Sequence, residues 1–187
     1  MEQMIRDVIG ASVKEFRLPR YEEIPDVGLY LEQTAHCLTE YLKPLDIAVT
    51  GSMVSNYVKR DLVKNPVKKL YDRERIAYLL FIAVAKSVLP LEDIQLLIRI
   101  QQVTYAPEVA YDYFCCELEN VLQVVFGLKD TLDEVGVEHT DAKVMLRNTI
   151  IAAAYSMICG LFLYRDLSWK DLPKILAEKY ADRISRL

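Results

Sequence analysis

The segment TGSMVSNYVKRDLVKNPVKKLYDRE, residues 50–74, decides the fold that the sequence predicts, because it joins a short helix to a basic stretch. Residues 51–75 hold seven Lys or Arg and three acids, a net charge of +4, whereas the whole 187-residue chain carries −4. Thr50 is a suitable N-cap, so we predict a helix from Gly51 to about Asp61. Its spacing buries four apolar residues, namely Met53, Val54, Tyr57 and Val58.

The residues on either side extend this pattern. Apolar residues recur every three or four positions between 31 and 45, which predicts a helix from Tyr30 to about Leu45. A tight turn through Asp46–Val49 then makes the two helices a helix-turn-helix unit. Pro66 ends regular structure, and VKKLYD at 67–72 is too short and mixed for a helix, so we expect an extended strand or hairpin arm there.

The rest of the chain is helical in pattern. We predict an amphipathic helix over residues 4–16, an irregular connector to residue 28, and a central buried helix over 73–88. Further helices are expected to begin at Pro90, Pro107 and Thr140, and a last one at Ser168 or Asp171. The sequence therefore predicts an all-α protein, divided into residues 1–104, with the helix-turn-helix, and residues 105–187, an all-helical dimerisation or effector part.

Composition favours a globular, cytoplasmic protein. Hydrophobic residues make up 52% of the chain and charged residues 27%, and the first residues lack the apolar run of a signal peptide. Four cysteines without a disulfide framework fit a reducing compartment. The uncharged run at 148–164 is at the lower limit for crossing a bilayer, and with no second span we favour a buried helix over a membrane helix.

No pattern in the sequence predicts catalysis. His36 and His139 have no Ser or Cys partner at local spacing, and the glycines form no phosphate-binding loop. Cys115 and Cys116 are adjacent and would point about 100° apart on a helix, a poor geometry for one metal ion. We expect no enzyme activity, no cofactor and no metal site.

The exposed part of the predicted unit suits double-stranded DNA. Small hydroxyl and amide side chains early on a helix can contact base edges, and Lys and Arg can contact phosphates. Lys68 and Lys69 would project as a wing toward the duplex, with Lys64 and Arg73 also at phosphates. The candidate residues are Thr50, Gly51, Ser52, Ser55, Asn56, Tyr57, Lys59, Arg60, Lys64, Lys68, Lys69, Tyr71 and Arg73. The alternative is that the lysines only form an ordinary solvated surface.

The order of these motifs resembles the DNA-binding domain of the mercury-resistance-regulator (MerR) superfamily, over about Leu31 to Ile98. Asn56–Tyr57 and Leu62 match the end of its recognition helix, Lys69 and Tyr71 its wing, and Leu91–Ile94 its next helix. Asp61 stands where that superfamily usually has glycine, and Ser55 where it commonly has arginine. The resemblance implies a winged helix-turn-helix fold and DNA binding.

The whole chain, including LPRYEEIPDVGLYLEQ at 18–33 and SNYVKRDLVKNPVKKLY at 55–71, also resembles domain-of-unknown-function family 1836. Together these features lead us to expect a DNA-binding transcriptional regulator that forms a homodimer. The alternative is a protein-interaction module that keeps the fold without binding DNA. The apolar C-terminal half could form the dimer interface, enclose a small-molecule effector, or serve only as core.

Overall fold

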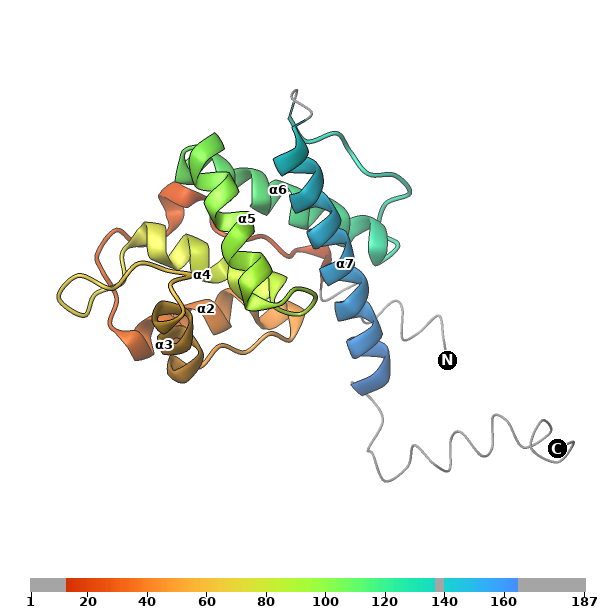
Figure 1. Ribbon diagram of the computed structural model, residues 1–187. Coiled ribbons are helices and arrows are strands. Elements are labelled where there is room, and N and C mark those ends of the chain that lie inside the picture. The colour runs from red at the N-terminus through yellow and green to blue at the C-terminus, as the bar shows by residue number, and fades with distance from the viewer. Residues whose placement is uncertain (1–12, 137–139, 165–187) are drawn as a thin grey trace, which may run out of the picture.

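The computed structural model describes residues 13–136 and 140–164, and over these residues it confirms the prediction of an all-α fold. The expected helix at 4–16, apart from its last residues, His139 and the expected last helix lie outside the described residues. The elements in Figure 1 are η1 (Tyr21–Glu23), α2 (Leu31–Leu42), η2 (Lys43–Leu45), α3 (Gly51–Lys59), α4 (Arg73–Ala85), α5 (Leu91–Thr104), α6 (Pro107–Val125) and α7 (Asp141–Tyr164), where η denotes a short 3-10 helix.

Local signals set where the helices begin. The hydroxyl of Thr50 accepts a hydrogen bond from the backbone N–H of Met53 at 3.3 Å, as expected for the N-cap of α3. Thr140 accepts similarly from the N–H of Lys143 at 3.4 Å and caps α7. Pro107 is the first residue of α6, where its missing N–H costs nothing.

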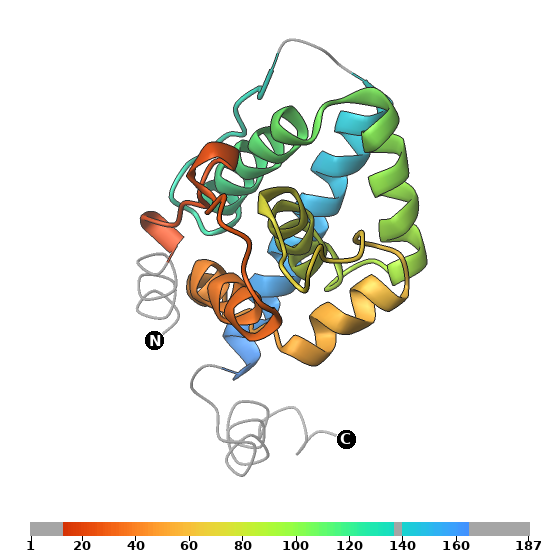
Figure 2. The same ribbon diagram turned by 90° about the vertical axis from the view of Figure 1, so that its left-hand side faces the viewer.

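Helix α4 is the centre of the molecule, as its continuous apolar pattern predicts. Ile76, Leu79, Leu80 and Ile82 are fully buried, and α4 packs against α2, α6 and α7. Figure 2 shows α4 with the other helices arranged around it. One cluster of buried side chains extends from α2 to α7, so described residues on both sides of the predicted boundary at residue 104 belong to a single core.

Acidic residues on α6 hold the irregular connector before α2 in place. Both terminal nitrogens of Arg20 donate to the carboxylate of Glu119 at 2.7 Å, and the backbone N–H of Leu18 donates to the same carboxylate at 3.1 Å. The N–H of Tyr21 donates to Asp112 at 2.7 Å. The connector is therefore packed onto the fold through charge-assisted hydrogen bonds.

A buried carboxylate joins α6 to α7. Glu117 is fully buried, and one of its oxygens accepts from the Arg147 guanidinium at 2.6 and 3.0 Å and from the Tyr113 hydroxyl at 2.9 Å. The inner face of α7 is buried at Ile150 and at two alanines, Ala153 and Ala154, whereas Val144 and Tyr155 on its outer face are more than half exposed. The expected buried helix is therefore buried on one face.

None of the helices within residues 13–136 and 140–164 is long and apolar enough to cross a membrane.

Candidate nucleic-acid interface

Helix α3 is held against α2 by a short, fixed connection. After η2 the chain turns at Asp46, whose φ of 57° lies in the left-handed region. Thr39 on α2 then pairs with the backbone of Val49: its hydroxyl accepts from the N–H at 3.0 Å and donates to the carbonyl at 3.1 Å. Val54 and Tyr57 are buried on the inner side of α3, so the opposite side of the helix is its outer face.

The outer face of α3 carries a stripe of short polar and basic side chains, which we call the polar stripe: Ser52, Ser55, Asn56 and Lys59. All four are exposed, and their spacing of three, one and three residues puts them on one side of the helix. Thr50 and Arg60 flank the stripe and are exposed as well. These six of the predicted contact residues are therefore accessible.

Two predicted contact residues on α3 are not on this surface. Gly51, which we expected to be exposed, is buried, and a Cβ at this position would lie 2.4 Å from a carboxylate oxygen of Glu32. Tyr57 is only 3% exposed, and burial raises the pKa of its hydroxyl. We correct the candidate surface by removing both, because neither can reach a ligand outside the fold.

The basic loop after α3 forms a tight turn with two lysines at its tip, which we call the lysine turn: Val67–Leu70. The N–H of Val67 donates to the carbonyl of Leu70 at 3.1 Å, and the reverse bond is 2.9 Å. Lys68 and Lys69 between them have φ values of 52° and 66°. Positive φ at both central residues marks a type I′ hairpin turn, which normally contains Asn-Gly. The expected hairpin arm is thus reduced to a turn with isolated bridges.

The lysine turn is anchored at its base. Leu29 and Tyr71 exchange backbone hydrogen bonds of 2.9 and 2.8 Å, which ties the turn to the segment before α2. Tyr71 is 4% exposed and therefore anchors the turn rather than contacting a ligand. A Cβ at Gly28 would lie 2.7 Å from the Cβ of Leu70, so only glycine fits there. The anchor presents Lys68 and Lys69 outward on a fixed base.

Carboxylates from distant parts of the chain neutralise several of the basic residues. Arg73 pairs with Glu22, and its Nε donates to the carbonyl of Ile24 at 2.9 Å. Its side chain is only 18% exposed, so we correct its predicted phosphate contact to a structural role. Two further predicted contacts are exposed but paired, Arg60 with Glu92 at 2.8 Å and Lys64 with Glu74 at 3.4 Å.

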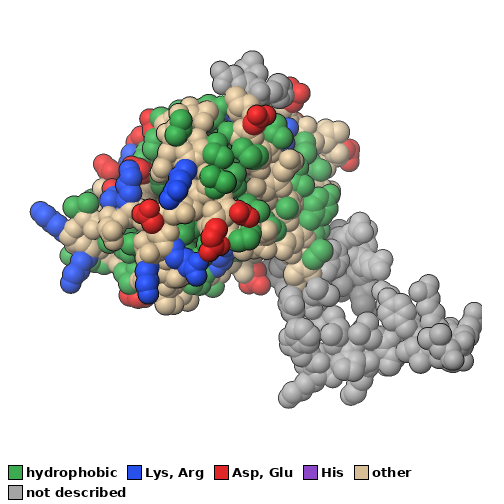
Figure 3. All heavy atoms as spheres, in the orientation of Figure 1, with side chains coloured by type: hydrophobic (Ala, Val, Ile, Leu, Met, Phe, Trp, Pro, Cys, Tyr) green, Lys and Arg blue, Asp and Glu red, His purple; other side chains and the backbone are tan. Residues whose placement is uncertain are grey.

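Three predicted cations keep their charge uncompensated. Lys59, Lys68 and Lys69 are exposed, and no carboxylate among the described residues forms an ion pair with them. In Figure 1 the loop between α3 and α4 projects on the left, opposite α7, and α3 lies below it. Figure 3 shows Lys and Arg side chains gathered over this region, with acidic side chains between them. The surface is basic but mixed.

Two residues that shape this surface, Glu32 and Gln95, come from other helices and were not among the predicted site residues. Glu32 on α2 places its carboxylate beside the first turn of α3, where the helix dipole favours an anion. Gln95 on α5 donates from its amide to the carbonyls of Arg60 and Asp61 at 3.1 and 3.2 Å. These bonds satisfy backbone carbonyls at the C-terminal end of α3. No local pattern identifies either role, because the partners are more than 18 positions apart.

The described residues assemble no metal-ligating cluster of three or more His, Cys, Asp or Glu side chains. Cys115 is fully buried, and burial raises the pKa of its thiol to about 12. A thiol with that pKa is protonated at neutral pH and is a poor nucleophile. Its neighbour Cys116 is half-buried and free.

Comparison with protein families places this surface in a known group of sequences. Residues 19–114, just over half of the chain, match the model of a family described as a domain of unknown function, DUF1836. The chain belongs to the DUF1836 family. The DUF1836 match includes α2 to α5 and the first part of α6, and therefore both the polar stripe and the lysine turn. No curated protein and no solved structure matched the chain.

Proposed function

We propose that this DUF1836 protein binds double-stranded DNA through the polar stripe and the lysine turn, as a transcriptional regulator. In this proposal α2 and α3 act as a helix-turn-helix of the winged, MerR-like type. The polar stripe enters the major groove and the lysine turn is the wing. Lys59, Lys68 and Lys69 lie at phosphates, with Arg60 and Lys64 joining them once their carboxylates are displaced.

The observation that supports the proposal most directly is the conformation of the lysine turn. A left-handed conformation costs a residue other than glycine about 1–2 kcal/mol. Two adjacent lysines adopt it at an exposed tip, where Asn-Gly would suit the turn better. Backbone strain of this kind concentrates at functional sites, and the side chains it presents here are uncompensated cations.

The proposal includes a homodimer in the cytoplasm. Helix-turn-helix proteins commonly pair so that two recognition helices meet two half-sites on DNA. The outer face of α7 offers apolar surface for pairing at Val144 and Tyr155, which are 51% and 56% exposed. Sedimentation equilibrium tests the dimer directly. Four free cysteines in the described residues agree with a reducing compartment.

The test is affinity for a random-sequence duplex across a salt series. Each phosphate neutralised by a cation contributes about −0.9 to the slope of log K against log salt. The three uncompensated lysines predict a slope of about −2.7, and recruitment of Arg60 and Lys64 would bring it to about −4.5. Absence of binding even at about 20 mM salt, where phosphate contacts are strongest, would overturn the proposal.

A matched pair of variants locates the contact. Lys68→Asn with Lys69→Gly keeps the turn type and removes two charges, so the slope should become less negative by about 1.8. Lys14→Gln with Arg17→Gln removes two exposed charges near the N-terminal end of the described residues and should leave the slope close to that of the unaltered protein. Equal effects of the two double variants would mean that net charge, and not this surface, controls binding.

The polar stripe has its own test. Asn56 is exposed in the middle of the stripe. Its amide can form two hydrogen bonds with the major-groove edge of an adenine, at N6 and N7. Asn56→Ala should change which sequences are enriched from a random duplex library, while leaving the salt slope unaltered. Identical enrichment by both proteins would remove base recognition from the proposal and leave phosphate binding alone.

One observation favours the second candidate, a protein-interaction module without DNA binding. Carboxylates of Glu92 and Glu74 pair with two of the predicted cations, and the Glu32 carboxylate lies at the start of α3. A surface of mixed charge suits a protein partner of mixed charge. Glu32→Gln distinguishes the two candidates, because it should tighten DNA binding if α3 faces phosphates.

A further inference from the structure

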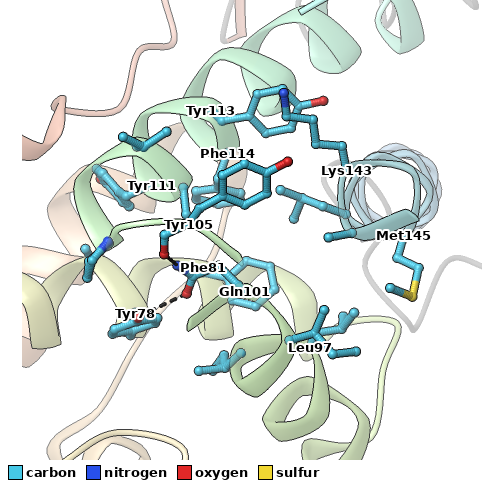
Figure 4. A pocket seen from close by; sticks show the side chains of 18 residues that line it. Tyr78, Phe81, Leu97, Gln101, Tyr105, Tyr111, Tyr113, Phe114, Lys143 and Met145 are labelled. Carbon is cyan, nitrogen blue, oxygen red and sulfur yellow. Dashed lines mark hydrogen bonds between the residues drawn. The ribbon is translucent and has the colours of Figure 1, made fainter. Parts of the chain in front are cut away.

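A cavity of about 220 Å³ lies between α4, α5, α6 and α7, at the junction of the two predicted parts of the chain. Figure 4 shows the side chains that converge on it from all four helices. Its walls are mostly apolar and include Phe81, Leu97, Phe114 and Leu146. The cavity is partly open to solvent, and a concave, mostly apolar pocket of this kind is the usual form of a small-molecule site.

The size and shape of the walls suit one aromatic ring. Phe81 on α4 and Phe114 on α6 meet edge to face, with ring centroids 5.5 Å apart and planes at 85°. Such walls offer both ring faces and ring edges to a further aromatic group. An apolar cavity of about 150 Å³ in another protein holds benzene, so 220 Å³ leaves room for a ring and a short substituent.

Most polar groups around the cavity are already engaged with the protein. Gln101 accepts from the Tyr78 hydroxyl at 2.9 Å and donates to the carbonyl of Tyr105 at 2.9 Å. The Tyr113 hydroxyl donates to Glu117 at 2.9 Å, and the Tyr105 hydroxyl lies 3.0 Å from that of Thr140. The Tyr111 hydroxyl is the exception, because it is buried near the Cys115 thiol and has no hydrogen-bond partner among the described residues.

Among the residues that line the cavity, Lys143 is the one with a charged side chain. It lies in the first turn of α7, and its ammonium group is 5.0 Å from the ring centroid of Tyr113 and 5.6 Å from that of Tyr105. No carboxylate among the described residues forms an ion pair with it. In Figure 4 its side chain extends along the rim of the cavity toward Tyr113. The aromatic rings fix the position of the cation beside an apolar chamber.

From this arrangement we propose that the cavity binds a small carboxylate that carries one aromatic ring. The ring lies against Phe81 and Phe114, and the carboxylate pairs with the ammonium group of Lys143. The apolar walls account for the ring, and Lys143, the one Lys or Arg among the lining residues, accounts for the negative charge. The inference does not rest on the proposed DNA binding, since no residue of the polar stripe or the lysine turn lines the cavity.

The experiment measures binding of 3-phenylpropionate and of its uncharged amide, 3-phenylpropionamide, by isothermal titration calorimetry on the full chain. The two probes have nearly the same shape and differ in charge. We expect saturable binding of the acid at one site per chain, and about tenfold weaker binding of the amide. Equal affinity for both probes, or no saturable binding of the acid up to about 5 mM, would overturn the proposal.

Variants of Lys143 test the ion pair. Lys143→Met keeps most of the length of the side chain without its charge, so the acid should lose its tenfold advantage while the amide binds as before. Lys143→Arg should restore most of the advantage. Lys14→Met removes an exposed lysine at the N-terminal end of the described chain and should leave both affinities unaltered. A preference for the acid that survives Lys143→Met would contradict the assignment.

A second variant tests the cavity itself. Ala142 lines the cavity from α7 and is partly exposed, so Ala142→Leu places three further carbons at its edge with little risk to folding. Both probes should then bind at least tenfold more weakly, while the melting temperature stays the same or rises. Unaltered binding in the folded variant would locate the probes elsewhere. Binding that depends on protein concentration would assign the apolar surface to a second copy of the chain instead.

Discussion

Cationic side chains have different environments in two regions of the molecule. Around α6, Arg20 and Arg147 approach carboxylates at 2.7 and 2.6 Å, and about three quarters of each side chain is covered. On the lysine turn, Lys68 and Lys69 are exposed, and no carboxylate in the described residues pairs with them. The arginines hold elements of the fold together, whereas the lysines are available to a partner. Burial and the nearest carboxylate, rather than residue type, separate the two roles.

The largest predicted effect breaks the buried pair of α6 and α7. Arg147→Met should lower the free energy of unfolding by about 3–5 kcal/mol, because it leaves the Glu117 carboxylate buried without a counter-charge. Urea denaturation followed by circular dichroism measures the change. Adding Glu117→Gln to Arg147→Met should recover part of the loss. A change below about 1 kcal/mol would mean that Glu117 finds another partner.

The second prediction concerns pH in the same region. Burial raises the pKa of the Cys115 thiol from 9.0 to about 12, so the folded protein keeps a proton that the unfolded chain releases. Its stabilising contribution is complete below pH 9 and is lost as the pH rises toward 12, with a loss on the order of 2 kcal/mol by about pH 10.5.

The measurement is urea denaturation at pH 8 and at pH 10.5, for the unaltered protein and for Cys115→Ala. Tyrosines with raised pKa values contribute to the alkaline loss in both proteins, so the difference between the two losses belongs to Cys115 together with its effect on the neighbouring Tyr111. Cys116→Ala, at a half-buried neighbour, is the control. Equal losses in the unaltered protein and in Cys115→Ala would contradict the prediction.

The third prediction separates stability from function on the lysine turn. Lys68→Asn with Lys69→Gly suits a type I′ turn better and should raise the free energy of unfolding by about 1–2 kcal/mol. The same double variant is expected to weaken DNA binding. Thermal unfolding and the salt series, done on one preparation, test both effects. A loss of stability would show that the turn depends on contacts of the lysine side chains.

The smallest effect is expected at the exposed pair of Arg60 and Glu92. Both side chains are more than half exposed, so Arg60→Met should change the free energy of unfolding by less than about 1 kcal/mol. The difference between the free-energy changes of Arg60→Met and Arg147→Met measures how much burial strengthens an Arg–Glu ion pair. A loss as large as that of Arg147→Met would remove the distinction between the two regions.

Much of the fold could be predicted because its signals are local. The N-cap at Thr50, the start of α6 at Pro107 and the continuous apolar pattern of α4 involve residues within a few positions of one another. The same local pattern identified the polar stripe, since helical spacing alone separates inner from outer residues. The predicted hairpin arm was too long, because only isolated bridges form around the turn.

The candidate site was harder to predict, and the errors share one cause. Arg73 was assigned to phosphate, but Glu22, some fifty positions earlier, pairs with it. Gly51 was expected to be exposed, but α2 brings Glu32 against it. No pattern in the sequence sets Glu117 apart from the other carboxylates on the helices, yet it is fully buried and pairs with Arg147. Each depends on a partner that sequence spacing does not reveal.

The sequence by itself determined the helices, their caps, the central position of α4 and the segment in which positive charge collects. These follow from backbone hydrogen bonding and from the burial of apolar residues at a regular period. Only the tertiary structure decided which cations are neutralised, that Glu32 covers Gly51, and that an apolar cavity lies beside Lys143. Ion pairs and cavities depend on how distant segments pack, and packing is a property of the whole fold.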